Sequence, residues 1–205
     1  MTVIRAVLGH LTPVLAYGLL QTMAPGQARA QDRLPSAAAL TPMLDSLEEV
    51  ALTADNLDRR VTAVLAISGP GRWWKLTGAE EPPSEILYPG IVERLVRVYR
   101  GNPQHYGIHY AIVGLMSQQA EREAAAAFLE EVAATERTDD SQTFLQNHAL
   151  SGLLYLGPPG RAALRRLYAN GTVRDPIARA TLEEFASRGF RPRGHLRERE
   201  KRKRP

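Results

Sequence analysis

Two adjacent tryptophans have the composition of a binding site. Trp73 and Trp74 stand between Arg72 and Lys75 in the stretch "SGPGRWWKLTGAEEPPSE". Tryptophan and arginine dominate binding hot spots, because a large rigid ring is desolvated at low entropic cost. Adjacent side chains point apart in regular structure, so we expect one ring to pack inward and the other to be more exposed. The stretch is therefore a candidate partner-binding site.

Two histidines have a spacing that could bind a metal ion. In "HYGIHYA", His105 and His109 lie four residues apart, which lets two imidazoles share a metal on one helix face. No third ligand follows at helical spacing, and His148 could approach only through the fold. We therefore predict no metal site and take His105, His109 and Tyr110 as candidate partner contacts. The alternative is an ordinary polar helix edge.

Motifs for catalysis are absent from the sequence. There is no Gly-x-Ser-x-Gly elbow, and "GPPGR" has prolines where a phosphate loop needs free backbone N–H groups. The chain has no cysteine, which excludes disulfides, thiol catalysis and iron–sulfur ligation. Paired acids such as Glu130-Glu131 fit solvated helix faces. We therefore expect no enzyme activity and no cofactor.

The first 32 residues, "MTVIRAVLGHLTPVLAYGLLQTMAPGQARAQD", have the pattern of a secretory signal peptide. Arg5 is followed by an uncharged stretch, and Ala28-Arg29-Ala30 has the small-x-small form that precedes cleavage. Residues 1–30 are thus predicted to be cleaved after Ala30 and the chain to be exported, to a periplasmic or extracellular location. Two alternatives stay open: an uncleaved membrane anchor, although prolines make this stretch a poor spanning helix, and a misassigned start codon.

The net charge of +4 combines an acidic body with a basic tail. Residues 31–187 carry fifteen basic and twenty acidic side chains, whereas residues 188–205 carry nine basic and two acidic ones. Residues 191–205 are predicted to be disordered, and to meet an anionic envelope surface or an acidic partner. A tail that solubilises the chain or touches its acidic body is the alternative. The candidate tail contacts are Arg191, Arg193, Arg197, Arg199, Lys201, Arg202, Lys203 and Arg204.

Apolar residues recur with helical spacing in four stretches. Leu145, Ala149, Gly152 and Leu153 fall on one helix face. The same template fits three further sets: Leu57, Val61, Val64 and Leu65; Ile108, Ile112, Leu115 and Met116; and Ala178, Leu182, Phe185 and Ala186. Each stretch follows another amphipathic segment, and Pro42 suits the first turn of the first one. The pattern predicts an all-α fold of eight helices in four antiparallel pairs.

The repeat intervals support stacked helix pairs. Equivalent positions 57, 108, 145 and 178 are 51, 37 and 33 residues apart, and helix-pair solenoids run near 33 to 47 residues per repeat. An insertion loop at 70–83 explains the long first interval, and its tryptophans have an alternative role, capping the open end of the first repeat. The predicted organisation is a linker over 31–41, a helical repeat domain over 42–190 and the basic tail.

The last of these helices resembles the second helix of a HEAT repeat. "DPIARATLEEFASRG" enters through Asp175-Pro176, carries Arg179 after its first inward residue and ends on Gly189. Asp58 stands at the arginine position in the first repeat, and His109 in the second. The resemblance implies a short α-solenoid of about four HEAT-like pairs wound as a right-handed α-α superhelix. It also implies a concave docking face lined by the second helices.

These observations together predict an exported, monomeric scaffold that binds an unidentified protein or peptide. The first alternative is a nucleic-acid-binding helical-repeat protein that uses the basic tail, which requires that the leader be misassigned. An envelope enzyme is a second alternative that rests on location alone. Nucleic acid is not an expected partner of an exported chain.

Overall fold

The computed structural model describes residues 35–77, 88–135 and 140–192, with the backbone alone at 76–77 and 140–142. Within these ranges the chain forms eight α-helices and one 3₁₀ helix, and no strand. The elements are α4 (Ala37–Thr53), α5 (Leu57–Ser68), η1 (Pro70–Thr77), α6 (Ile91–Gly101), α7 (Tyr106–Met116), α8 (Arg122–Ala134), α9 (Asp140–Tyr155), α10 (Pro158–Asn170) and α11 (Pro176–Ser187). The predicted all-α class is thereby confirmed.

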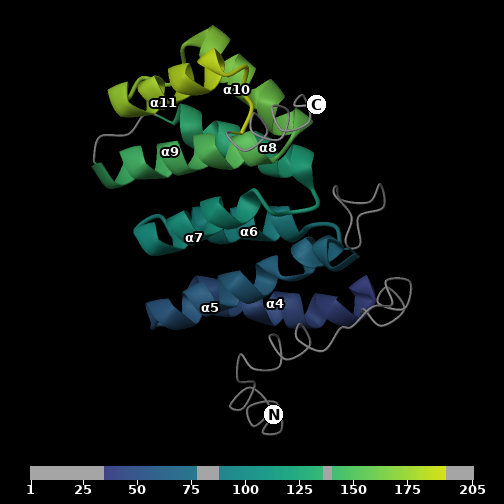
Figure 1. Cartoon of the computed structure of the whole chain (residues 1–205). Helices are drawn as coiled ribbons and strands as arrows, with labels where there is room; N and C mark the ends of the chain where they lie inside the picture. The colour runs from purple at the N-terminus through teal and green to yellow at the C-terminus, as the bar shows by residue number, and fades with distance from the viewer. Residues whose placement is uncertain (1–34, 78–87, 136–139, 193–205) are drawn as a thin grey trace, which may run out of the picture.

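The helices pack as four successive pairs in two rows (Figure 1). The first-helix row consists of α4, α6, α8 and α10, and the second-helix row of α5, α7, α9 and α11. Each helix contacts its pair partner and the next helix of its own row. In Figure 1 the pairs follow one another from the purple end to the yellow end. Side chains between the rows and between the pairs form one continuous hydrophobic cluster.

Three of the four predicted stripes face this core. The apolar residues predicted for α7 and α9 are buried, as are Ala178, Leu182 and Phe185 of α11. The stripe on α5 was right only in part: Val64 is buried and Val61 packs against the core, but Leu57 and Leu65 are exposed. The buried residues of α5 are Ala63, Val64, Ile67 and Ser68, of which the pattern predicted only Val64. The two leucines are turned toward solvent.

The first helix begins earlier than the sequence predicted. Ser36 caps α4 by accepting a hydrogen bond from Ala39 N at 3.2 Å. Residues 37–41, expected in a linker, therefore belong to the helix. Pro42 stands in its second turn, where it lacks an N–H to donate to Ala38 O. The leader (1–30) and residues 31–34 of the predicted linker lie outside the described residues.

Each helix of the second-helix row carries a polar side chain that contacts a backbone carbonyl. The carbonyl lies at the C-terminal end of the helix's pair partner or in the turn that joins the two helices. This recurring contact holds together the two helices of a pair at the point where the chain reverses. The four contacts are Arg60 Nε to Ala54 O, His109 Nε2 to Tyr99 O (3.0 Å), Gln146 Nε2 to Thr135 O (2.7 Å) and Arg179 Nε to Val173 O (3.3 Å).

The recurring contact revises the register of the first repeat. Positions 60, 109, 146 and 179 are 49, 37 and 33 residues apart, so the equivalent residue of the first pair is Arg60 and not Asp58. In the last pair, Asp175 caps α11 by accepting from Ala178 N at 2.8 Å, and Pro176 begins the helix. The Asp-Pro entry and Arg179 thus have direct structural roles.

Candidate partner-binding surface

The first predicted site, the tryptophan pair, belongs to the core rather than to an open surface. Residues 70–77, expected in an insertion loop, form the short helix η1, while residues 78–83 lie outside the described ranges. Trp74 is only 8% exposed, and its Nε1 donates to Gln118 O at 3.2 Å. Gly71 O accepts from Ala120 N at 2.9 Å, so η1 is fixed against the turn between α7 and α8. Trp74 is therefore not available to a partner.

The rest of the tryptophan stretch also makes internal contacts. Trp73 is partly buried, and its ring meets that of Tyr88 edge to face at 5.0 Å. Lys75 Nζ lies 5.7 Å and Arg122 Cζ 5.6 Å from the Trp74 ring centroid. Burial lowers the pKa of Lys75, with a further contribution from the positive charges of Arg72 and Arg122. One tryptophan is inward and the other more exposed, as the sequence predicted.

The two histidines of the predicted pair, His105 and His109, differ in how deeply they are buried. His109 is 9% exposed, and its ring stacks on Tyr99 with centroids 3.9 Å apart. Its Nε2 makes a hydrogen bond with Tyr99 O, so the side chain joins α7 to α6 and is not available to a partner. His105 is half-buried at the N-terminal boundary of α7. Among the described residues, no three His, Cys, Asp or Glu side chains converge as a metal-binding group.

Tyr110, the remaining candidate, leads to a surface that spans two second helices. It is exposed, and its ring stacks on His148 of α9 with centroids 4.5 Å apart. Tyr106, one turn earlier on α7, lies 6.0 Å from Tyr110 between centroids. Phe144 and Tyr155 are 67% and 66% exposed and share the outward stripe of α9 with His148. We call these five side chains the aromatic face.

Close approach of α7 and α9 depends on a glycine. A Cβ added at Gly114 would lie 2.7 Å from His148 Nε2, so the imidazole occupies the space that a side chain would fill. Burial also lowers the pKa of His148, which favours the neutral ring. The imidazole at the centre of the aromatic face is therefore uncharged at neutral pH.

The second-helix row differs from the rest of the surface in apolar exposure. Among the described residues, nine large apolar side chains are exposed, and seven of them lie on second helices. These seven are Leu57, Leu65, Tyr106, Tyr110, Phe144, Tyr155 and Ile177. Helix α7 contains no Asp, Glu, Lys or Arg, and α9 contains none after Asp140. The middle of the row is therefore apolar, aromatic and free of formal charge.

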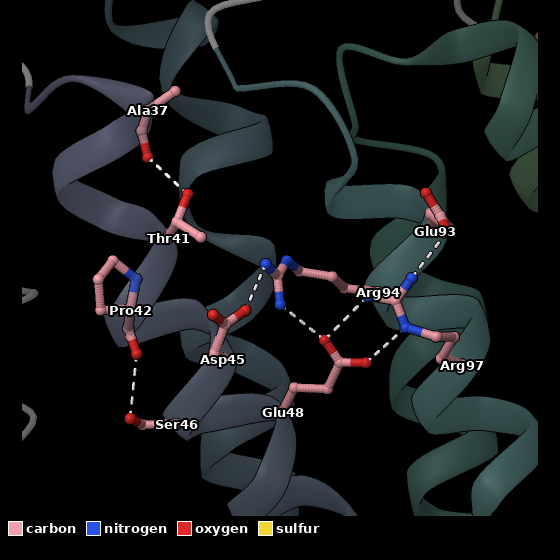
Figure 2. Close-up of polar contacts among 9 residues, drawn as sticks. All are labelled: Ala37, Thr41, Pro42, Asp45, Ser46, Glu48, Glu93, Arg94 and Arg97. Carbon is pink, nitrogen blue, oxygen red and sulfur yellow. Dashed lines mark hydrogen bonds and ion pairs between the residues drawn. The ribbon is translucent and has the colours of Figure 1, made fainter.

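The first-helix row is charged, and ion pairs cross it. Figure 2 shows Arg94 and Arg97 of α6 converging on Glu48 of α4. Arg94 lies 2.6 Å from Asp45 and 2.7 Å from Glu48, and Arg97 lies 2.6 Å from Glu48 and 2.8 Å from Glu93. Hydrogen bonds from Arg97 are the largest cause of a lowered pKa for the Glu48 carboxyl, and they also raise the pKa of Arg97.

The same pattern continues along the row. Arg100 of α6 pairs with Glu131 of α8 at 3.0 Å, and Arg166 of α10 pairs with Glu130 of α8 at 2.6 Å. Salt bridges thus join each first helix to the next. A surface committed to internal ion pairs contrasts with the neutral aromatic face, which makes the second-helix row the candidate binding surface.

Sequence reasoning missed four members of this face as partner contacts: Tyr106 on α7, and three residues on α9. Phe144, His148 and Tyr155 share an outward stripe of a helix that has no charged residue after its first position. An apolar outer stripe on an otherwise charge-free helix was the signal that could have identified them. Residues 193–205, which include all predicted tail contacts except Arg191, lie outside the described ranges; Arg191 itself is exposed.

Comparison with known proteins gives no relative for this chain: no protein-family model, no curated protein and no solved structure matches it. Among the described helices, none combines the length and hydrophobicity needed to cross a bilayer.

Proposed function

We propose that this protein is a short HEAT-like α-solenoid that acts as a binding scaffold for another protein or peptide. The two rows of helices would wind as a right-handed superhelix, with the second-helix row as the docking side. The observation that carries the proposal is the asymmetry of exposed apolar residues, seven of nine lying on second helices. Exposed apolar surface concentrated on one side of a soluble domain marks an interaction site.

The aromatic face supplies the contacts that this function needs. Tyrosine and phenylalanine give large contact area for few rotatable bonds, and stacking of Tyr110 on His148 fixes one ring before a partner arrives. A preordered surface loses less side-chain entropy on binding.

A displayed library of random peptides tests this proposal with the folded protein. We expect selected peptides to bind the wild type and to lose about tenfold or more in affinity to Tyr110→Ala and Phe144→Ala. Arg166→Ala is the matched control, because Arg166 is exposed on the opposite row. Selected peptides that bind all three variants equally would place binding elsewhere. Peptides that depend on residues 191–205 would favour the tail and, with steep salt dependence, nucleic acid.

We propose in addition that the protein is exported, because Ala28-Arg29-Ala30 ends an uncharged leader. Intact mass of the protein from a fractionated native host tests this. We expect the exported fraction to contain a protein with the mass of a chain that starts at Gln31. A chain that starts at Met1 in the cytoplasm would contradict export.

A further inference from the structure

The chemistry of the aromatic face restricts what can dock on it. Its outward side chains are rings and small neutral residues, with Ser151 on the stripe between His148 and Tyr155. Asp140 begins α9, and its side chain is not among those described. Among the described side chains, the charged residues of the second-helix row lie at its two ends, on α5 and α11: Asp58 and Arg59 are exposed, as are Arg179 and Glu183. From His105 to Met116 and from Thr143 to Tyr155, the described side chains of the centre therefore offer a partner neither an Asp or Glu nor a Lys or Arg.

A charged group placed over this centre would lose hydration without gaining an ion pair. Burying an uncompensated charge is strongly unfavourable, whereas covering exposed rings with apolar groups is favourable in proportion to the area removed from water. The cost applies to either sign of charge, since α7 and the later part of α9 are neutral.

We propose that the aromatic face selects an uncharged, apolar segment of its partner and rejects segments that place a charge of either sign over α7 and α9. This inference rests on the proposed function and adds to it the chemical class of the partner. Charge matching argues for this occupant: a neutral centre between charged ends fits a neutral segment, with any partner charges placed outward along the row.

The first test uses peptides selected from the random library on wild-type protein. One central apolar residue of a binding peptide is replaced by Asp, by Lys or by the neutral Gln. We expect Asp and Lys each to weaken binding about tenfold or more, and Gln to weaken it less than either. We also expect affinity to change little with salt, because no ion pair forms.

The second test places the charge on the protein. Ser151→Asp and Ser151→Lys introduce opposite charges at one position, and Ser151→Asn is the neutral control that matches Asp in size. Both charged variants should weaken binding of the unmodified peptide, while Ser151→Asn retains it. Thermal unfolding of each variant establishes that it is folded, and the peptide series does not depend on these variants.

The outcomes separate the inference from the proposed function. Peptides that need Tyr110 and Phe144 but bind more tightly with one sign of charge would overturn the inference and leave the function intact. Absence of any peptide that needs these residues would overturn the function itself. Analytical sedimentation tests whether a second copy of this chain occupies the face. If the wild type forms a dimer that Tyr110→Ala abolishes, the partner is a second copy and the inference is wrong.

Discussion

Tyr110 and His148 lie face to face across the boundary between α7 and α9, with ring centroids 4.5 Å apart and planes inclined by 12°. They belong to second helices of successive pairs, so this contact joins the second pair to the third at the surface. The imidazole is also the one member of the aromatic face that gains charge on mild acidification. The stack therefore links the shape of the face to pH.

We expect His148 to make the fold less stable in mild acid. Burial lowers the pKa of His148 from its ordinary value of 6.5. The unfolded chain then binds the proton more readily than the folded one, so protonation favours unfolding. The stability due to the neutral ring is fully present above about pH 6.5 and is lost as pH falls through the folded pKa. Urea unfolding of the wild type at a series of pH values measures this loss.

His148→Gln is the control for this pH dependence. The variant lacks the titrating group, so its free energy of unfolding should fall less than that of the wild type between about pH 7 and about pH 5. Identical pH dependence in the two proteins would contradict the assignment to His148.

Glu48 should matter far more to stability than Glu93, although both contact Arg97. The Glu48 side chain is 12% exposed and holds two guanidinium groups, so Glu48→Gln is expected to cost about 1–3 kcal/mol in the free energy of unfolding. Glu93 is 75% exposed, and Glu93→Gln should cost less than about 0.5 kcal/mol. Chemical denaturation of both variants measures the difference, and equal costs would refute the argument from burial.

Asn102 should be a second point of high sensitivity. It is buried at the end of α6, donates from Nδ2 to Val98 O at 2.8 Å and to Ala51 O at 3.2 Å, and accepts from Arg60 Nη1 at 2.7 Å. Asn102→Ala removes contacts to α4 and α5 together, and we expect a loss of about 2–3 kcal/mol in unfolding free energy.

The matched control is Asn170→Ala. Asn170 is the last residue of α10, close to the same place in its pair, but it is exposed. We expect this substitution to change stability by less than about 0.5 kcal/mol. Thermal or urea unfolding of the two variants tests the comparison, and an equal loss would show that the buried bonds of Asn102 contribute little.

The helix pairs were predictable because large apolar residues recur at one face of α7, α9 and α11. On α5 this signal succeeded only in part, since two of its four residues, Leu57 and Leu65, are exposed. The template took Leu57 as its first position and so omitted Ala63 and Ile67, which are buried. Leucine and isoleucine are equally large and apolar, so their spacing alone does not tell which of them faces the core.

The binding surface was less predictable, because it depends on contacts between distant segments. Buried Trp74 donates a hydrogen bond to Gln118 O, 44 residues away, and buried His109 makes one with Tyr99 O of the preceding helix. Local spacing shows neither contact. Tyr110 was identified, but its partner His148 was considered only as a metal ligand, because stacking between α7 and α9 follows from the packing of successive pairs.

Two glycines of α7 allow a matched test of that packing. Gly→Ala in a helix ordinarily stabilises by about 0.4–1 kcal/mol, by reducing the freedom of the unfolded chain. A Cβ at Gly107 would meet only Leu57 Cδ2 at 4.0 Å, an ordinary contact, so Gly107→Ala should be stabilising. A Cβ at Gly114 would lie 2.7 Å from His148 Nε2, so Gly114→Ala must displace the imidazole from Tyr110 and should be neutral or destabilising.

A double variant identifies the cause. If the imidazole alone opposes the new methyl group, Gly114→Ala should become stabilising in a His148→Ala background, with an interaction energy of about 0.5–1.5 kcal/mol between the two positions. Urea unfolding of the four proteins in this cycle gives that energy directly. If Gly114→Ala stabilises the wild type as much as Gly107→Ala does, the His148 ring moves aside freely. The ring would then not be fixed before binding, and the preordering assigned to the aromatic face would be wrong.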